Sequence, residues 1–183
     1  MSKTVLVPIA DGTEEIEAVC LIDTLRRAGA QVTVASVMPH AQVKAARGTH
    51  LVADALLTGC ANQTFDAIAL PGGMPGAEHL RDCAPLAAML KKQKEAGRIY
   101  AAICASPAVV FEHHGLLKGK KATCYPSMSD QLRDASAAGQ RVVTDGNCIT
   151  SQGPATAIEF ALAIISALFG ADKAGKVADS MLV

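Results

Sequence analysis

Short apolar runs alternate with helical segments along most of this chain, and this alternation limits the fold more than any other feature. The runs have the length and composition of strands that are buried on both faces of a sheet. We expect strands at residues 3–10, 31–37, 65–70, 98–103, 121–124, 141–144 and 148–151, and a small hairpin piece at 49–53. We expect helices at 14–28 (with Thr13 as N-cap), 86–96, 105–111, 154–168 and 174–182. This order predicts an α/β three-layer sandwich with a mainly parallel sheet.

The composition agrees with one such domain and argues against several other classes. The chain has 183 residues, of which 50% are hydrophobic, so residues 1–183 are predicted to form a single domain rather than a disordered chain. Basic and acidic residues number 17 each, and aromatic residues make up 3%. Nucleic acids and membrane surfaces attract surplus positive charge, and single strands stack on aromatic rings. We therefore expect no stable nucleic-acid complex and no membrane partner.

The first residues and the cysteines favour a cytoplasmic location. Residues 1–10 lack the long apolar stretch and cleavage site of a signal peptide. The apolar run at 155–171 is interrupted by Glu159 and is too short for a membrane span. The six cysteines contain no Cys-x-x-Cys pair, so we expect free thiols rather than disulfides or zinc ligands. No metal and no cofactor are expected.

Cys104 is the strongest candidate for a catalytic residue. It follows an apolar strand directly and precedes the small residues Ala105 and Ser106, with Pro107 at the start of a helix. This is the layout of a nucleophile elbow, a tight turn that holds the side chain over the edge of the sheet. The start of a helix favours a thiolate, and the N–H groups of Ala105 and Gly73 are placed to bind an oxyanion. The alternative is that Cys104 is a small buried apolar residue, as most free cysteines are.

Glu17 is the second candidate. The residues three and four positions further along its helix are Cys20 and Leu21, so Glu17 lies at the edge of the buried face. Glu14 and Glu15 are expected to reach water more easily. A carboxyl group at such an edge has a raised pKa, and when protonated it can donate a hydrogen bond to a thiolate and act as an acid or base. The alternative is a solvated glutamate that stabilises the helix dipole.

The usual histidine partner of a catalytic cysteine is missing from the pattern. None of the five histidines lies at a predicted strand end beside Cys104. His113 and His114 are neighbours on one helix and point about 100° apart, so they are poorly placed to chelate one ion. The pair Gly72–Gly73 lacks the remaining residues of a phosphate-binding loop, which leaves the nucleotide signal weak.

Four segments in order resemble the markers of the DJ-1/ThiJ/PfpI superfamily. They are DGTEEIE at 11–17, LPGG at 70–73, AAICASP at 101–107 and TSQGP at 150–154. The resemblance covers essentially the whole chain and is closest to the DJ-1 branch, near its bacterial YajL-type members. It implies a flavodoxin-like sandwich and a homodimer, with the reactive cysteine at Cys104 and the protonated glutamate at Glu17. It places oxyanion and substrate contacts at Gly72, Gly73, Ala105, Tyr125 and Arg47, the last reaching the site from the dimer interface.

The resemblance also implies a range of activities. They are deglycation of glyoxal- and methylglyoxal-modified proteins and nucleotides, cofactor-free glyoxalase activity and redox-regulated chaperone behaviour. The DJ-1 branch often has a histidine where Tyr125 stands, and the protease-like branch has one where Ala105 stands. We therefore disfavour a protease and expect a slow cysteine-dependent enzyme that acts on small aldehyde adducts. The alternative is an oxidative-stress sensor or redox-regulated chaperone in which Cys104 is oxidised to a sulfinate.

Overall fold

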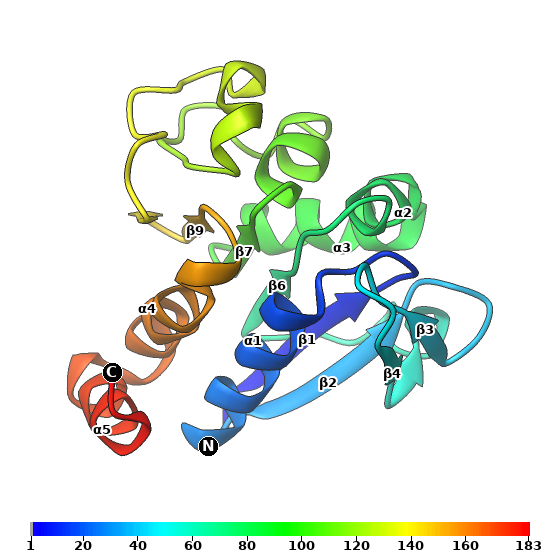
Figure 1. Ribbon diagram of the computed structural model, residues 1–183, viewed down its shortest axis with the longest axis horizontal. Helices are drawn as coiled ribbons and strands as arrows, with labels where there is room; N and C mark the ends of the chain where they lie inside the picture. The colour runs from blue at the N-terminus through cyan, green and yellow to red at the C-terminus, as the bar shows by residue number, and fades with distance from the viewer. Residues whose placement is uncertain (1) are drawn as a thin grey trace.

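The computed structural model describes residues 2–183 and contains a seven-stranded sheet with helices on both faces (Figure 1). The sheet consists of β1 (Thr4–Ile9), β2 (Gln31–Ser36), β5 (Ala55–Leu56), β6 (Ala67–Leu70), β7 (Ile99–Ile103), β8 (Val142–Asp145) and β9 (Cys148–Ser151), in the order β5-β2-β1-β6-β7-β9-β8. Within this sheet only the pair of β8 and β9 is antiparallel. The five longer parallel strands follow the flavodoxin-like order, second-first-third-fourth-fifth. The predicted sandwich is confirmed.

The helices form two layers around this sheet. They are α1 (Glu15–Arg27), α2 (Gly76–Asp82), α3 (Ala84–Glu95), α4 (Ala157–Phe169) and α5 (Ala171–Met181), with shorter turns η1 (Leu57–Gly59), η2 (Pro107–Glu112), η3 (Pro126–Gln131) and η4 (Pro154–Thr156). In Figure 1, α1, α4 and α5 cover one face of the sheet, and α2 and α3 lie on the other. None of the helices in residues 2–183 combines the length and the apolar character needed to cross a membrane.

The apolar residues of β1 alternate between these two layers. Val5, Val7 and Ile9 pack in the core with α1 and α4, whereas Leu6 packs in the core with α3 and η2. Each of these side chains is fully buried. Because both faces of a parallel strand are covered, the strand reads as a continuous apolar run, which is why it was predictable from the sequence.

A small hairpin, β3 (Gln42–Lys44) with β4 (His50–Val52), lies beside the start of α1. The expected piece at 49–53 is β4, and β3 is its unpredicted partner. The backbone of the hairpin is bonded to the turn before α1, because Gly12 N donates to Lys44 O at 2.8 Å and Ala46 N donates to Thr13 O at 2.8 Å. The hairpin therefore holds the residues of its turn, 45–49, against this end of the sheet.

Several local predictions are wrong. No strand forms at 121–124, because Lys121 N donates to Asp145 Oδ2 and Thr123 N donates to Thr150 Oγ1, so side chains replace the partners of a strand ladder. Thr13 does not cap α1, since its Oγ1 accepts from Ala10 N at 2.9 Å and Glu14 is the N-cap residue. The helix α2 was not predicted. The helix expected at 154–168 begins as the separate turn η4, and the last helix begins at Ala171.

Candidate active site

Cys104 lies in a strained turn directly after β7. Its φ angle is 65°, in the left-handed region, and among residues 2–183 only Leu182 shares this property without being a glycine. Its backbone is fixed on both sides, because Cys104 N donates to Ser151 O at 2.9 Å and Cys104 O accepts from Tyr125 N at 2.8 Å. Non-glycine residues in this region cluster at functional sites, where the surrounding structure holds them. The predicted elbow is therefore present.

Two glycines allow the end of β6 to pack against this elbow. A Cβ atom added to Gly72 would lie 2.6 Å from Cys104 Cβ and 2.9 Å from Ile103 O. Gly73 has a φ angle of 89°, and an added Cβ there would collide with the backbone of Gly12. Ser106 ties the same two segments together, since its Oγ donates to Pro71 O at 2.6 Å. The small residues are thus required by close backbone approach.

Glu17 is fully buried on α1 beneath the elbow. Its Oε2 accepts from Gly72 N at 2.7 Å, and its Oε1 has no partner at ordinary hydrogen-bond geometry. The Cys104 thiol lies close enough to the carboxyl group to form a polar contact with it. Burial raises the pKa of Glu17 to about 7, although the Gly72 N–H and the thiol act in the opposite direction. Glu17 is thus a buried acid with a raised pKa, and the alternative of a solvated helix-start glutamate is wrong.

The thiol of Cys104 is subject to opposing influences. Burial and then the charge of an ionised Glu17 raise the pKa of Cys104 to about 12, whereas the N–H groups of Gly73 and Ala105 lower it. The sequence predicted that the start of the helix lowers the pKa of Cys104. Burial beside Glu17 acts in the opposite direction and raises it. Two adjacent buried acids repel each other when both are charged, so near neutral pH the pair carries at most one negative charge. That charge is located on the sulfur when Glu17 keeps the proton, and on the carboxylate when Cys104 keeps it.

A cavity of about 460 Å³ opens over the sulfur. Five of the predicted site residues line it, namely Cys104, Gly73, Ala105, Arg47 and Tyr125. Gly72 and Glu17 lie behind this lining, in contact with Cys104. The remaining lining residues were not predicted and are Glu14, Ala46, Met74, Ser127, Met128 and Pro154. The volume suits a small molecule or a single modified side chain.

Arg47 and Glu14 form the hairpin side of this cavity. The Arg47 side chain is 79% exposed, and its Nε lies 3.9 Å from Glu14 Oε2. Its backbone N–H donates to the Glu15 carboxylate at 3.0 Å, which fixes the hairpin turn to the start of α1. Arg47 therefore reaches the cavity of its own chain. Glu14 is only 7% exposed, so the expectation that it reaches water easily is wrong. The hairpin of β3 and β4 covers Glu14, and nothing in the sequence around Glu14 indicates this contact.

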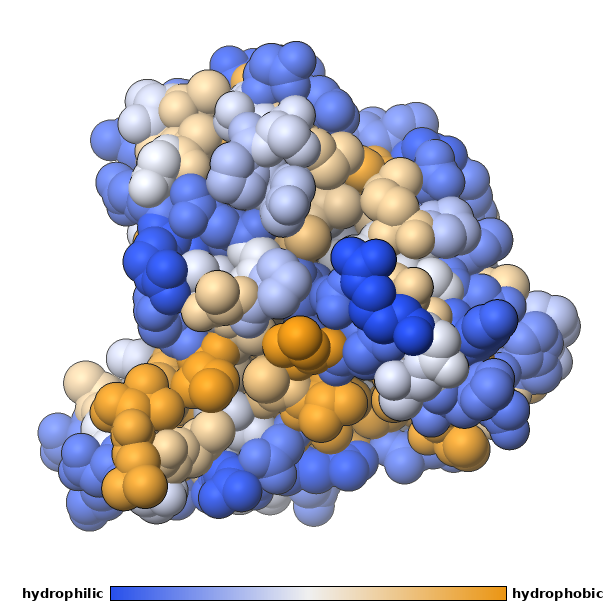
Figure 2. Space-filling model, in the orientation of Figure 1, coloured by the Kyte–Doolittle hydropathy of each residue, from blue (hydrophilic) through white to orange (hydrophobic). Residues whose placement is uncertain are grey.

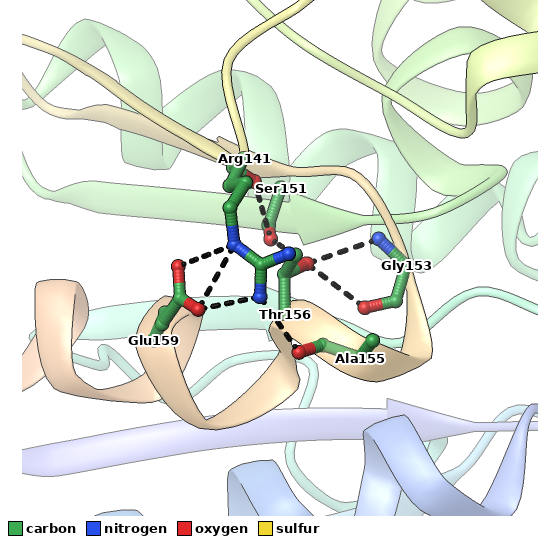
Figure 3. A network of polar contacts seen from close by, with 6 residues as sticks. All are labelled: Arg141, Ser151, Gly153, Ala155, Thr156 and Glu159. Atoms are coloured by element: carbon green, nitrogen blue, oxygen red, sulfur yellow. Dashed lines mark hydrogen bonds and ion pairs between the residues drawn. The ribbon is translucent and has the colours of Figure 1, made fainter. Parts of the chain in front are cut away.

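A polar network fixes the opposite wall of the cavity, at Pro154 (Figure 3). Arg141 bonds to the Glu159 carboxylate and donates to Ala155 O at 3.0 Å. In the same network, Thr156 Oγ1 lies 2.6 Å from Ser151 Oγ and accepts from Gly153 N at 3.1 Å. Pro154 lies between these anchored residues, so β8, β9 and α4 together hold its ring at the cavity.

The fold and the site together define a class: flavodoxin-like α/β proteins with a cysteine at a strained strand-to-helix elbow beside a buried glutamate. The chain belongs to the DJ-1/PfpI family, whose family model matches residues 3–167. Protein DJ-1 homolog B of Arabidopsis thaliana is 52% identical over 179 residues, which are 98% of this chain and 41% of that protein. The chain thus spans less than half the length of this Arabidopsis relative. Glutathione-independent glyoxalase DJR-1.2 of Caenorhabditis elegans is 38% identical, over 94% of this chain and 91% of its own.

Solved structures agree with this assignment and with the DJ-1 branch. The oxidized form of Toxoplasma gondii DJ-1 has a TM-score of 0.96 at 52% identity, covering 99% of this chain and 98% of its own. Drosophila melanogaster DJ-1beta has a TM-score of 0.92 at 41% identity, covering 100% of this chain and 99% of its own. The resemblance found in the four sequence segments is confirmed.

Proposed function

We propose that this chain is a cysteine-dependent enzyme that acts on glyoxal and methylglyoxal and on their adducts with amines and thiols. The observation that carries the proposal is the position of Cys104, strained at its elbow, in contact with the buried Glu17 and under a cavity of about 460 Å³. The relative named a glutathione-independent glyoxalase supports it at 38% identity. The type of enzyme is a deglycase or a slow cofactor-independent glyoxalase. The Ala105 that follows the cysteine disfavours a protease.

The reaction starts from the form in which Cys104 is a thiolate and Glu17 holds the proton. With free methylglyoxal, the sulfur bonds to the aldehyde carbon and the carbonyl electron pair moves to oxygen, where Glu17 protonates it. With an amine adduct, the C–S bond forms as the C–N bond breaks, and the amine leaves with the proton of Glu17. Both routes give the same hemithioacetal on Cys104. The N–H groups of Gly73 and Ala105, which act on the sulfur in the free site, are placed to stabilise the developing oxyanion.

The second half of the reaction needs no external oxidant, because the hemithioacetal carbon is oxidised while the neighbouring carbonyl carbon is reduced. The Glu17 carboxylate moves a proton from the hemithioacetal carbon to the adjacent carbonyl carbon, and the hydroxyl proton moves to the former carbonyl oxygen, which leaves a thioester and a new alcohol. Water then cleaves the C–S bond and releases lactate, or glycolate from glyoxal, with the thiol restored. Tyr125 lines the cavity where many DJ-1-branch members carry a histidine, so Glu17 and water supply the base and turnover is slow.

The direct test compares the wild-type chain with Cys104→Ser. We expect the wild type to consume methylglyoxal with release of lactate, and to release the free amine from a methylglyoxal-treated lysine derivative. Cys104→Ser is expected to show neither reaction above the uncatalysed rate. Equal rates for the two proteins would remove Cys104 as the nucleophile. The thermal unfolding midpoint of each protein checks that the substitution leaves the fold intact.

A second candidate function, as an oxidative-stress sensor or redox-regulated chaperone, uses the same sulfur. Two peroxide molecules each transfer one oxygen to the thiolate and leave as water, which gives a sulfinate. The acid of Glu17 and the N–H groups of Gly73 and Ala105 are positioned to bind its oxygens, and a 52% identical structure is named as oxidized. We expect a gain of two oxygens confined to Cys104 in the intact and peptide masses after mild peroxide. Oxidation spread over all six cysteines would contradict this role.

We also propose that the chain forms a homodimer and works in the cytoplasm. Ile16 and Val19 of α1 and Val52 of β4 are large exposed apolar residues. Figure 2 shows apolar residues gathered over α1 and along α4 and α5, the type of surface that marks a protein interface. All six cysteines are free thiols, as a reducing compartment keeps them. Sedimentation of the wild type and of Val19→Asp tests the dimer, since a charge on this face should give monomers.

A further inference from the structure

A second carboxylate, Glu14, lies buried beside the proposed nucleophile. It lines the same cavity as Cys104, and it precedes Glu17 by three residues, so the two glutamates lie one helical turn apart. The only ion pair of Glu14 among residues 2–183 is the long contact of 3.9 Å to the largely exposed Arg47. A carboxylate that is shielded from water and weakly paired exerts a strong field on its neighbours.

The backbone holds the two glutamates in a fixed relation. Glu14 N donates to Gly72 O at 3.0 Å, and Gly72 N donates to Glu17 Oε2 at 2.7 Å. Glu14 O accepts from Ala18 N at 3.0 Å, which anchors it in the first turn of α1. Both glutamates are therefore hydrogen-bonded to Gly72, which packs against Cys104.

We propose that Glu14 is a positioning residue that directs the single negative charge of the site onto the sulfur of Cys104 by keeping the proton on Glu17. The inference rests on the proposed role of Cys104 and adds a third member to the pair. Its physical basis is that Glu14, the N-cap residue of α1, lies one turn before Glu17, so its negative charge disfavours a second charge on Glu17. Glu14 thereby selects between two forms of the site that have the same total charge.

The influences on the two pKa values agree with this direction. The charge of Glu14 raises the pKa of Glu17, whereas the shift of Cys104 arises from burial, Glu17 and two backbone N–H groups. The titratable groups around Glu14 are Glu15 and Glu17 on the helix that follows it, Arg47 on the hairpin turn, Cys104 on the elbow and Tyr125 across the cavity. Of these, Arg47 carries the only positive charge, so it weakens the effect of Glu14.

The test is the rate of alkylation of Cys104 by iodoacetamide, followed by peptide mass from mildly acidic to alkaline pH. In Glu14→Gln, Glu17 ionises more easily and takes the shared charge. We expect the alkylation rate on its neutral-pH plateau to fall about threefold for each half unit by which the pKa of Glu17 drops, and the midpoint to move to lower pH. Glu14→Asp retains the charge and should keep most of the wild-type rate.

Two further variants separate this role from a structural one. Asp23→Asn removes the same charge from an exposed position of α1 and should leave the profile unchanged. Arg47→Gln removes the opposing charge from an exposed side chain that the fold does not require, and should raise the plateau. In a Glu17→Gln background, Glu14→Gln should have no further effect, because no shared proton remains.

Two different failures are distinguishable. A wild-type Cys104 that is alkylated only in alkali overturns both this inference and the proposed nucleophile. A wild type that reacts near neutral pH, with an unchanged profile in Glu14→Gln and Arg47→Gln, overturns the inference alone. The inference is also overturned if Glu14→Gln slows Cys104 alkylation as much in the Glu17→Gln background as it does in the wild type.

Discussion

Gly72 donates its backbone N–H to the carboxyl group of Glu17 at 2.7 Å, and this bond joins the end of β6 to the buried face of α1. The same Gly72 lies so close to Cys104 that no Cβ fits between them. Gly72 therefore fixes the distance between the Glu17 carboxyl group and the Cys104 thiol, which belong to two other segments of the chain. The chemistry proposed for the pair depends on that separation, because the two groups share one negative charge.

The first prediction concerns Gly72→Ala. The new methyl group would lie 2.6 Å from Cys104 Cβ, so the backbone of the elbow must move. We expect a loss of about 1–3 kcal/mol in the free energy of unfolding and a misplaced thiol. The measurement is urea denaturation together with Cys104 alkylation. Gly175→Ala is the matched control: nothing lies within 4 Å of a Cβ there, and the site is inside α5, so it should stabilise by up to about 1 kcal/mol.

The second prediction is a dependence of stability on pH that originates at Glu17. Its pKa is raised from 4.5 to about 7 in the folded state, so the folded chain holds this proton to higher pH than the unfolded chain does. Stability therefore falls as pH rises from 4.5 to about 7, by about 3 kcal/mol in total, and this contribution does not change further above that range. Denaturation curves of the wild type and Glu17→Gln across this range check it. Parallel pH profiles for the two proteins would contradict it.

The third prediction concerns the strain at Cys104. Glycine adopts a φ angle of 65° without the penalty that a Cβ imposes, whereas serine retains the penalty. We expect Cys104→Gly to be about 1 kcal/mol more stable than Cys104→Ser, with both proteins inactive toward methylglyoxal. A serine variant as stable as the glycine variant would show that the elbow stores no strain.

The fourth prediction concerns Tyr125, which lines the cavity at the position where the resemblance to the DJ-1 branch implies a histidine. An imidazole with a pKa near 6.5 is a far better base at neutral pH than a phenol. We expect Tyr125→His to raise methylglyoxal turnover about tenfold, and the gain should disappear as the imidazole becomes protonated in acid. Tyr125→Phe is the control and should match the wild type. A rate for Tyr125→His equal to that of Tyr125→Phe at neutral pH would exclude a base at this position.

The sequence predicted those parts of the molecule that depend on local pattern. The strands at 3–10 and 98–103 are apolar after their first residues because helices cover both of their faces, and the elbow at Cys104 follows from a strand, a cysteine and small residues in succession. Glu17 was found because the residues one turn further along its helix are apolar.

The parts that depend on distant contacts were not predictable in this way. Glu14 is covered by a hairpin that begins almost thirty residues later, and no local signal marks that contact. The segment at 121–124 has the composition of a strand, but Asp145 and Thr150 supply side-chain partners for its N–H groups. The raised pKa of Cys104 has the same origin, since its burial and its nearness to Glu17 come from the packing of α1 against the elbow.

The central claim is that Cys104 and Glu17 share one negative charge near neutral pH and that the sulfur carries it in the reacting form of the site. The most direct measurement is the ultraviolet absorbance of the thiolate, taken as the difference between the wild type and Cys104→Ser during a pH titration. We expect a thiolate step with its midpoint near pH 7, where the pair loses its first proton, because the pKa of about 12 for Cys104 includes the charge of an already ionised Glu17. A thiolate signal that emerges only above pH 9, the ordinary value for a cysteine, would contradict the claim.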